Sequence, residues 1–298
     1  MVLWLTVLIT VIASGFAYSM RGEALAARNT MSLSQARAAA DGAVERMAFE
    51  LMRPRNLADV WKADGLSHSW KDGDIEIVAT AVDEGARIDL NTASDALLKG
   101  LLQNVGGLDT DAAQRVLEAI LDWRDGDELR RPNGAEAPEY RAAGLKYVPS
   151  NRRFESTGEL GRVLGVTPAL MAKVADSVTV YSQHSGINPA TASRDVLLSL
   201  PGITPDRVDA FIAGRAEALA QRLPIPPLPA AQAYTAGAVI AWRISAQARA
   251  PDGVTFVRDA VLSTQFSAQR PLVVLLWQEG APLPRPEAAP TDQNAMQK

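Results

Sequence analysis

The sequence contains no cysteine and only two histidines, His68 and His184. It therefore forms no disulfide, and it offers neither thiolate ligands for a metal nor a thiol nucleophile. Two histidines exclude a multi-histidine metal centre and disfavour a histidine-based catalytic triad. The sequence also lacks a glycine-rich phosphate loop, a nucleophile elbow and a zinc-ligand spacing. These absences argue against the commonest classes of enzyme.

An excess of basic residues is also missing. The 298 residues carry a formal net charge of −4, whereas a basic patch is the expected signature of a nucleic-acid-binding protein. Hydrophobic residues make up 47% of the chain, which is enough for folded cores and argues against wholesale disorder. The length favours about two domains in addition to any membrane segment.

Residues 1–20 contain no charged side chain, and the first charge is Arg21. Twenty helical residues span roughly 30 Å, the thickness of the hydrocarbon core of a bilayer. A cleaved secretory signal usually has a shorter apolar run, preceded by a basic segment, so we predict a transmembrane segment over 1–20. Because nothing basic precedes this segment, the positive-inside rule is poorly satisfied. We expect that a short basic leader has been lost, through processing or through the choice of start codon.

The helical pattern continues beyond the apolar segment. An apolar stripe with three- and four-residue spacing is formed by Leu33, Ala36, Ala40, Val44, Met47 and Leu51. No proline occurs before Pro54, where the helix should end. We predict one helix of about 50 residues, on the order of 75 Å long, whose part 21–53 is amphipathic. The alternative is an anchor and a separate helix, with the break at Gly15 or Gly22.

Residues 87–90 are a candidate for a short strand that leads onward from the first group. Longer stretches of strand-like composition occur at 75–82, 238–248, 254–264 and 272–277. Their spacing predicts one antiparallel sheet, with one face covered by the apolar stripe of the N-terminal helix. Residues 53–73 are interpreted as a loop with short turns. The sequence therefore predicts an α+β fold, in which a β domain is built from 54–88 and 230–280.

A long helical segment separates the two groups of strands. Residues 91–223 have almost no strand signal, and 223–229 form an extended proline-rich connector. We therefore predict an all-α insertion over 89–229, which returns the chain to the sheet. The tail 281–298 is rich in proline, alanine and polar residues, and we expect it to be disordered.

The insertion contains an internal repeat. Residues 89–98 resemble 186–198, because both place Asn and Thr or Ser at a helix N-cap before an apolar pair. The second copy continues into 199–205, a tight turn that looks like a helix-hairpin-helix motif, and 158–168 is a related fragment.

Helix-hairpin-helix turns can bind DNA phosphates through backbone N–H groups, which suggests a membrane-tethered DNA receptor. Against this, Thr204 stands where such DNA binders usually carry a second glycine. Three acids, Asp195, Asp206 and Asp209, also interrupt the basic residues of this region. A helix-packing module that binds no DNA is the favoured interpretation.

Acidic residues are concentrated in 122–128 and 133–140. Clustered carboxylates repel one another unless they are solvated, paired or bound to a cation, and hard oxygen ligands favour calcium. If Asp125 is the first position of an EF-hand-like loop, Arg130 replaces the required glycine at the sixth position and Leu129 offers no side-chain oxygen at the fifth. The loop is therefore not an EF-hand. A different oxygen cage and a solvated acidic loop both remain open, whereas a glycosidase carboxylate pair is disfavoured.

Together these features resemble the minor pseudopilin K family of type II secretion systems, also called general secretion pathway protein K. The resemblance extends in order over nearly the whole chain, and it is carried by the N-terminal helix and by 36–46, 87–93, 120–127, 134–140 and 187–192. It implies a pilin-like fold, in which the long N-terminal helix packs on the sheet and the α insertion holds helix-hairpin-helix or SAM-like repeats.

The resemblance also implies a non-enzymatic protein of the bacterial inner membrane, with a single membrane pass and the bulk of the chain in the periplasm. Such a protein would sit at the tip of the pseudopilus, initiate its assembly and support protein export across the outer membrane. Its partners would be the I- and J-type minor pseudopilins, membrane lipid, a prepilin peptidase and secreted exoproteins, but no nucleic acid. The alternative is a helix-hairpin-helix DNA-binding protein of a DNA-uptake system.

Calcium in the α insertion is a further implication of the resemblance. The calcium ligands would be among five carboxylates: Asp122, Asp125, Asp127, Glu136 and Glu139. The family's run of acids after Gly-Ala-Glu is interrupted here by Ala137 and Pro138.

Most pilin-like subunits carry a glutamate near the start of the apolar helix, where it pairs with the terminal amine of the neighbour above. Residues 1–20 contain none. A subunit with nothing above it needs no such glutamate, which agrees with a position at the tip. An ordinary membrane anchor would lack the glutamate as well.

Overall fold

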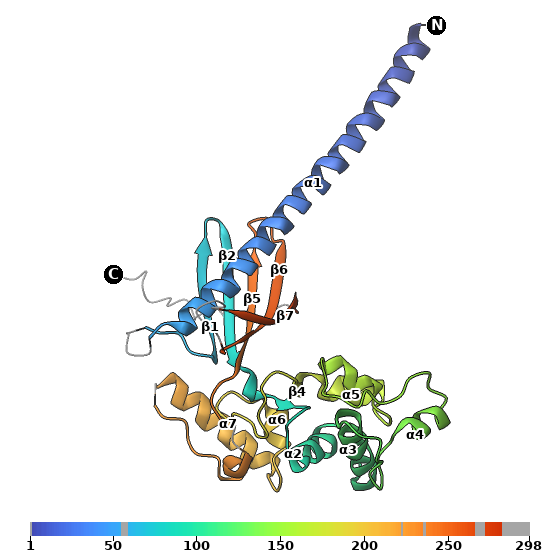
Figure 1. Cartoon of the computed structure of the whole chain (residues 1–298). Helices are drawn as coiled ribbons and strands as arrows, with labels where there is room; N and C mark the ends of the chain where they lie inside the picture. The colour runs from blue at the N-terminus through green and yellow to red at the C-terminus, as the bar shows by residue number, and fades with distance from the viewer. Residues whose placement is uncertain (1, 55–58, 222, 235–236, 266–271, 282–298) are drawn as a thin grey trace.

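The structure is a computed structural model, and it describes residues 2–54, 59–221, 223–234, 237–265 and 272–281. Figure 1 shows a long helix that projects from a sheet, with a mostly helical domain at the opposite end of the molecule from the N-terminus. The predicted disordered tail lies almost entirely outside the described residues. The α+β architecture predicted from the sequence is confirmed.

The N-terminal helix α1 (Val2–Met52) is continuous, so the alternative of a break at Gly15 or Gly22 is wrong. It ends just before Pro54, which removes a backbone donor and clashes with the preceding turn. Residues 2–31 are exposed along their whole length, and burial begins at Ala36. The helix therefore has a free N-terminal half and a packed C-terminal half.

The packed half of α1 buries mainly small side chains, namely Ala36, Ala40, Ala43, Val44, Met47 and Ala48. Alanine allows the helix to approach the sheet closely, and small side chains face it from the strands at Ala79, Ala246 and Ala260. The predicted stripe is confirmed at its centre, whereas Leu33 remains 46% exposed.

The sheet has the strand order β1–β2–β5–β6–β7, and every neighbouring pair is antiparallel. The strands are β1 (Asp64–Asp72), β2 (Ile75–Asp83), β5 (Ala241–Arg249), β6 (Thr255–Ser263) and β7 (Val273–Glu279). One face packs on α1, as predicted.

Strand β1 corrects the sequence interpretation, which placed a loop with short turns over 53–73. It pairs with β2 in a register that sets His68 opposite Ala79 and Trp70 opposite Ile77. As an edge strand it is largely exposed, so its sequence lacks the apolar alternation by which a strand is recognised. Its tryptophan is held instead by Arg46, whose guanidinium carbon lies 4.5 Å from the Trp70 ring centroid.

The inserted domain is mainly helical. Its α-helices and its π-helical turn are α2 (Asp95–Gly100), η2 (Leu101–Val105, the π-helical turn), α3 (Thr110–Arg124), α4 (Ala137–Ala142), α5 (Pro168–Val174), α6 (Arg194–Leu198) and α7 (Pro205–Ala220). The 3-10 turns and two-residue strands are η1 (Glu84–Ala86), β3 (Ile88–Asp89), η3 (Thr157–Arg162), η4 (Ala175–Ser177), β4 (Val178–Thr179) and η5 (Pro229–Tyr234). Strands β3 and β4 form a parallel pair.

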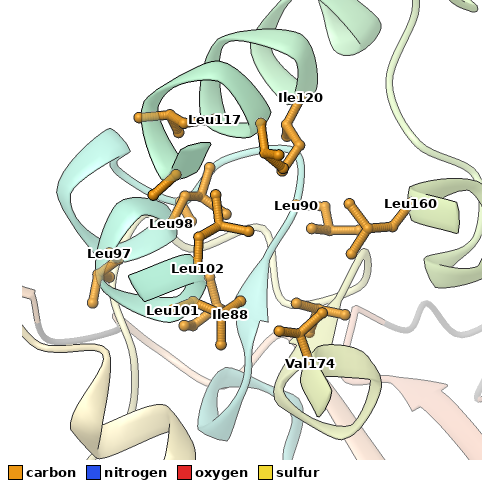
Figure 2. Close-up of a cluster of buried hydrophobic side chains, with 14 of the residues drawn as sticks. Ile88, Leu90, Leu97, Leu98, Leu101, Leu102, Leu117, Ile120, Leu160 and Val174 are labelled. Atoms are coloured by element: carbon orange, nitrogen blue, oxygen red, sulfur yellow. The ribbon is translucent and has the colours of Figure 1, made fainter. Parts of the chain in front are cut away.

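A leucine-rich core holds the inserted domain together. Figure 2 shows Leu98, Leu102, Leu117 and Ile120 gathered between neighbouring helices, with Ile88 beside them. These side chains are at most 3% exposed. Burying a leucine or isoleucine fully stabilises the fold by about 1.5–3 kcal/mol, so the insertion has a core of its own, separate from the one between α1 and the sheet.

The internal repeat forms two helix–turn–helix units. Ser94 caps α2 and Ser193 caps α6, each by accepting a hydrogen bond from the backbone N–H three residues later. The units meet closely, because a Cβ placed on Gly100 would lie 2.0 Å from the carbonyl oxygen of Ser199. In the second unit the turn after α6 uses Gly202 at φ 71°, a conformation that favours glycine.

Candidate cation site in the inserted domain

The acidic segment connects α3 to α4. Asp122 lies in the last turn of α3, Asp125 is the C-cap residue of that helix, and Glu136 is the N-cap residue of α4. The two ends of the segment are held by an aromatic cluster, in which the Trp123 ring centroid lies 6.1 Å from that of Tyr140. The loop is therefore anchored on both sides by the core of the inserted domain.

Asp122 is fully buried, and the chain makes room for it at Gly134. A Cβ on Gly134 would lie 2.0 Å from Asp122 Oδ2, so any side chain there would displace the carboxylate. A buried carboxylate needs compensation, which comes from Arg131. The backbone N–H of Arg131 donates to Asp122 Oδ2 at 3.2 Å.

The side chain of Arg131 joins two of the predicted ligands. Its Nη1 donates to Asp122 Oδ1 at 2.7 Å and to Asp125 Oδ2 at 2.5 Å. The hydrogen bond with Asp125, opposed by partial burial and reinforced by Asp122, raises the pKa of Arg131 above its already high usual value. Sequence reasoning missed this residue, although it lies in a loop whose other charges are mostly acidic.

Glu136 has no such partner. It is 3% exposed, and neither carboxylate oxygen has a hydrogen-bond partner among the described residues. Burial, together with the negative charges of Asp122 and Asp125, raises its pKa to about 7. Oδ1 of Asp125 is likewise buried without a partner. Three buried oxygens in this loop thus lack the donor or cation that would stabilise their charge.

The remaining predicted ligands lie nearer the surface. Asp127 is exposed, and it accepts a hydrogen bond from the Leu129 N–H at 2.8 Å. Glu139 accepts one from the Glu136 N–H at 3.0 Å and lies 3.4 Å from Arg130. Both carboxylates have partners within the loop. Of the five predicted ligands, Asp122 and Asp125 are the two that the structure brings together, through Arg131.

Glu118 is a neighbouring acid that the sequence interpretation did not include. Its burial alone would raise its pKa, but hydrogen bonds from Gln114 and Asn133 outweigh burial and lower it. One of its oxygens accepts from the Asn133 N–H and the other from Gln114 Nε2 at 2.7 Å. Glu118 is therefore a satisfied carboxylate that fastens the loop to α3.

The donor chemistry of the loop fits a hard cation. All its candidate ligands are oxygens, which calcium and magnesium prefer, and the unpartnered oxygens of Asp125 and Glu136 are the atoms that a cation would satisfy. Among the residues that the structure describes, no three acidic or histidine side chains form a ready ligand cluster. Metal binding would therefore require rearrangement of this loop.

The turn after α6, in the second repeat unit, is poorly suited to bind DNA phosphates. Arg194 forms a two-pronged pair with Asp209, with distances of 2.7 and 2.9 Å. Arg215 donates to the carbonyl oxygens of Pro189 and Ala192, both at 2.8 Å. These two arginines are thus engaged within the protein, which disfavours the DNA-receptor alternative.

Comparison with known proteins gives concordant results. Residues 76–183 match the family model described as type II secretion system (T2SS), protein K. The chain is 33% identical over 102 residues to type II secretion system protein K of Pectobacterium carotovorum subsp. carotovorum, and 34% identical over 79 residues to that of Dickeya chrysanthemi. These alignments cover 33% and 26% of this chain, but only 31% and 21% of the relatives.

The fold is similar to a solved structure as well. A chain of the GspK–GspI–GspJ complex from the type 2 secretion system of enterotoxigenic Escherichia coli superposes with a TM-score of 0.58. The superposition covers 89% of this chain and all of that chain, at 16% sequence identity. At this identity the match establishes the shared fold, which is that of a pilin-like subunit.

Proposed function

We propose that the chain, which matches the type II secretion system protein K family model over residues 76–183, is a member of that family and is the minor pseudopilin at the tip of a type II secretion pseudopilus. The observation that carries the proposal is the position of the inserted domain. It lies beyond the C-terminal end of α1, at the end of the molecule farthest from the N-terminus (Figure 1). Because helical subunits stack along their long helices, a domain in this place would obstruct a further subunit above it.

The anchoring role of α1 is supported by its composition and exposure. It is the one helix in the described part of the chain that is long and apolar enough to cross a membrane. Its first acid is Glu23, so the apolar part offers no carboxylate to the amine of a subunit above. We place this part in the inner membrane before assembly and in the filament core afterwards, with the remainder in the periplasm.

The I- and J-type minor pseudopilins are the partners that this proposal assigns. The solved complex that shares the fold contains GspI and GspJ. In this chain, the exposed N-terminal half of α1 is a continuous surface for helix packing. A trimeric tip of this kind would initiate pseudopilus assembly and could present a surface to exoproteins.

Calcium belongs to the proposal as a structural ligand. Asp125 and Glu136 would hold it through their unpartnered oxygens, and Asp122, Asp127 and Glu139 would complete or support the site. Calcium would supply positive charge to a loop of mutually repelling carboxylates and so stabilise the inserted domain. The role of the protein is structural and non-enzymatic.

Site-directed photo-crosslinking tests the position at the tip. Because the chain has no cysteine, a single introduced cysteine labelled with benzophenone-maleimide reports one position. We expect Ala27→Cys, on exposed α1, to crosslink to the cognate I- or J-type subunit in assembled pseudopili. Lys146→Cys, exposed on the inserted domain, should give no crosslink to the major pseudopilin. Efficient crosslinking of Lys146→Cys to that subunit would show subunits above this chain and contradict the tip placement.

A further inference from the structure

Arg131 occupies a position that a metal ion could take. A single guanidinium nitrogen lies 2.7 Å from an oxygen of Asp122 and 2.5 Å from an oxygen of Asp125. A calcium ion that bridged these two carboxylates would sit roughly 2.3–2.6 Å from the same atoms. Arg131 therefore balances the charge of these two carboxylates in the metal-free protein.

Arg131 does not satisfy all the carboxylates of the loop. It engages Asp125 through Oδ2, and Oδ1 of that residue stays buried without a partner in the described part of the chain, as do both oxygens of Glu136. These unpartnered atoms are a second observation, independent of the acidic composition, that indicates a place for an additional cation. Calcium takes six to eight oxygens, so a site that used these three atoms would need further oxygens, some of which the other carboxylate oxygens of the same loop can supply.

Arginine and calcium compete for those further oxygens. The guanidinium uses one oxygen of Asp122 and one of Asp125, and two cations a few ångströms apart repel strongly where water screens them poorly. The Arg131 side chain is 37% exposed, so it has a path into solvent when it leaves the carboxylates. The loop can thus exchange one cation for another without unfolding of the core beneath it.

We propose that Arg131 is the resident counter-cation of the acidic loop, and that a divalent cation displaces its guanidinium from Asp122 and Asp125 when it binds. This inference rests on the calcium site proposed above. It gives the loop two states, one closed by arginine and one bound to the metal. The arginine keeps the inserted domain folded before calcium arrives, and it sets how much calcium is needed.

Calorimetric titration of calcium chloride into the full chain, in detergent micelles and previously stripped with EDTA, tests the proposal. Arg131→Gln removes the competitor, so we expect its dissociation constant for calcium to fall by roughly tenfold or more. The stoichiometry should stay the same, and the melting temperature in EDTA should be lower. Arg131→Lys keeps a positive charge and should bind calcium with an affinity close to that of the unaltered chain. Arg141 is an exposed arginine on α4, so Arg141→Gln is the matched control. It should change neither the calcium affinity nor the melting temperature in EDTA.

The outcomes separate this inference from the calcium proposal. If Arg131→Gln binds calcium with unchanged or weaker affinity, the competition is overturned while the calcium site stands. If neither the unaltered chain nor Arg131→Gln binds calcium, the calcium proposal and the inference that rests on it both fail. If Arg131→Gln is unfolded in EDTA, calcium should restore its native circular dichroism, and failure to do so would also overturn the inference.

Discussion

Arg243 and Glu84 form a buried two-pronged ion pair between the sheet and the inserted domain. Arg243 Nε donates to Glu84 Oε2 at 3.0 Å, and Nη2 donates to Oε1 at 2.8 Å. Glu84 is fully buried and also accepts a hydrogen bond from Thr179 Oγ1 at 2.7 Å. Asp259 receives the third donor of the arginine at 2.9 Å. Strand β5, η1 and β4 are thereby tied together where the chain passes from one domain to the other.

The first prediction concerns this junction. Glu84→Ala leaves the Arg243 guanidinium buried with one carboxylate partner instead of two, and breaking a buried pair in this way typically costs about 3–5 kcal/mol. We expect the free energy of unfolding to fall by that order, as measured by urea denaturation of the full chain in micelles. Arg194→Ala breaks an exposed pair, with side chains 48% and 54% exposed, and should cost no more than about 1 kcal/mol. Equal losses in the two variants would contradict the structural importance of the junction.

The second prediction concerns the glycine beneath Asp122. Gly134→Ala places a Cβ against Asp122 Oδ2, and such overpacking typically costs about 1–3 kcal/mol. The melting temperature should fall accordingly. Gly126→Ala is the matched control in the same loop, because a Cβ there meets nothing within 4 Å. A Gly134→Ala variant as stable as the control would show that the packing around Asp122 differs from that described.

The third prediction concerns calcium. Ligand that binds only the folded state stabilises it by about 2.7 kcal/mol at a concentration of one hundred times the dissociation constant. Calcium should therefore raise the melting temperature of the inserted domain, and the double variant Asp125→Asn, Asp127→Asn should abolish the rise. Asp206→Asn, an exposed acid in the first turn of α7, serves as the control. A metal-independent melting temperature in the unaltered chain would refute the calcium proposal.

The fourth prediction concerns pH in the absence of metal. The pKa of Glu136 is raised to about 7 in the folded chain, above its ordinary value of 4.5. The folded state therefore holds a proton that the unfolded state has lost, so stability falls as pH rises from about 4.5 to about 7. In EDTA, the melting temperature should decrease over this window. Glu136→Gln should flatten the decrease, and a profile identical to that of the unaltered chain would count against the burial of this carboxyl.

The fifth prediction concerns nucleic acid. Arg194 and Arg215, near the second turn, are engaged by Asp209 and by backbone carbonyls, and the chain has a net charge of −4. The full chain in micelles should not retard duplex DNA in a gel at physiological salt. Retardation that weakens steeply as salt increases would indicate phosphate binding and revive the alternative of a DNA receptor.

Local sequence determined several features of this protein by itself. The absence of charge in 1–20 and of proline before Pro54 predicted one long helix with an apolar part. Capping at Ser94 and Ser193 depends on a side chain three residues from its partner, so it is visible in the sequence as well. The acidic loop was recognisable from composition, because carboxylates adjacent in sequence remain neighbours in any fold.

Only the tertiary structure decided how those carboxylates are used. Whether Asp122 faces an arginine or a metal depends on the path of the loop between α3 and α4, and so does the burial of Glu136 at the N-cap of α4. Strand β1 was missed because its stability comes from pairing with β2 rather than from its own apolar alternation. Glu84 and Arg243 are 159 residues apart, and no local pattern pairs them. Such contacts depend on packing between distant segments, which composition and periodicity do not encode.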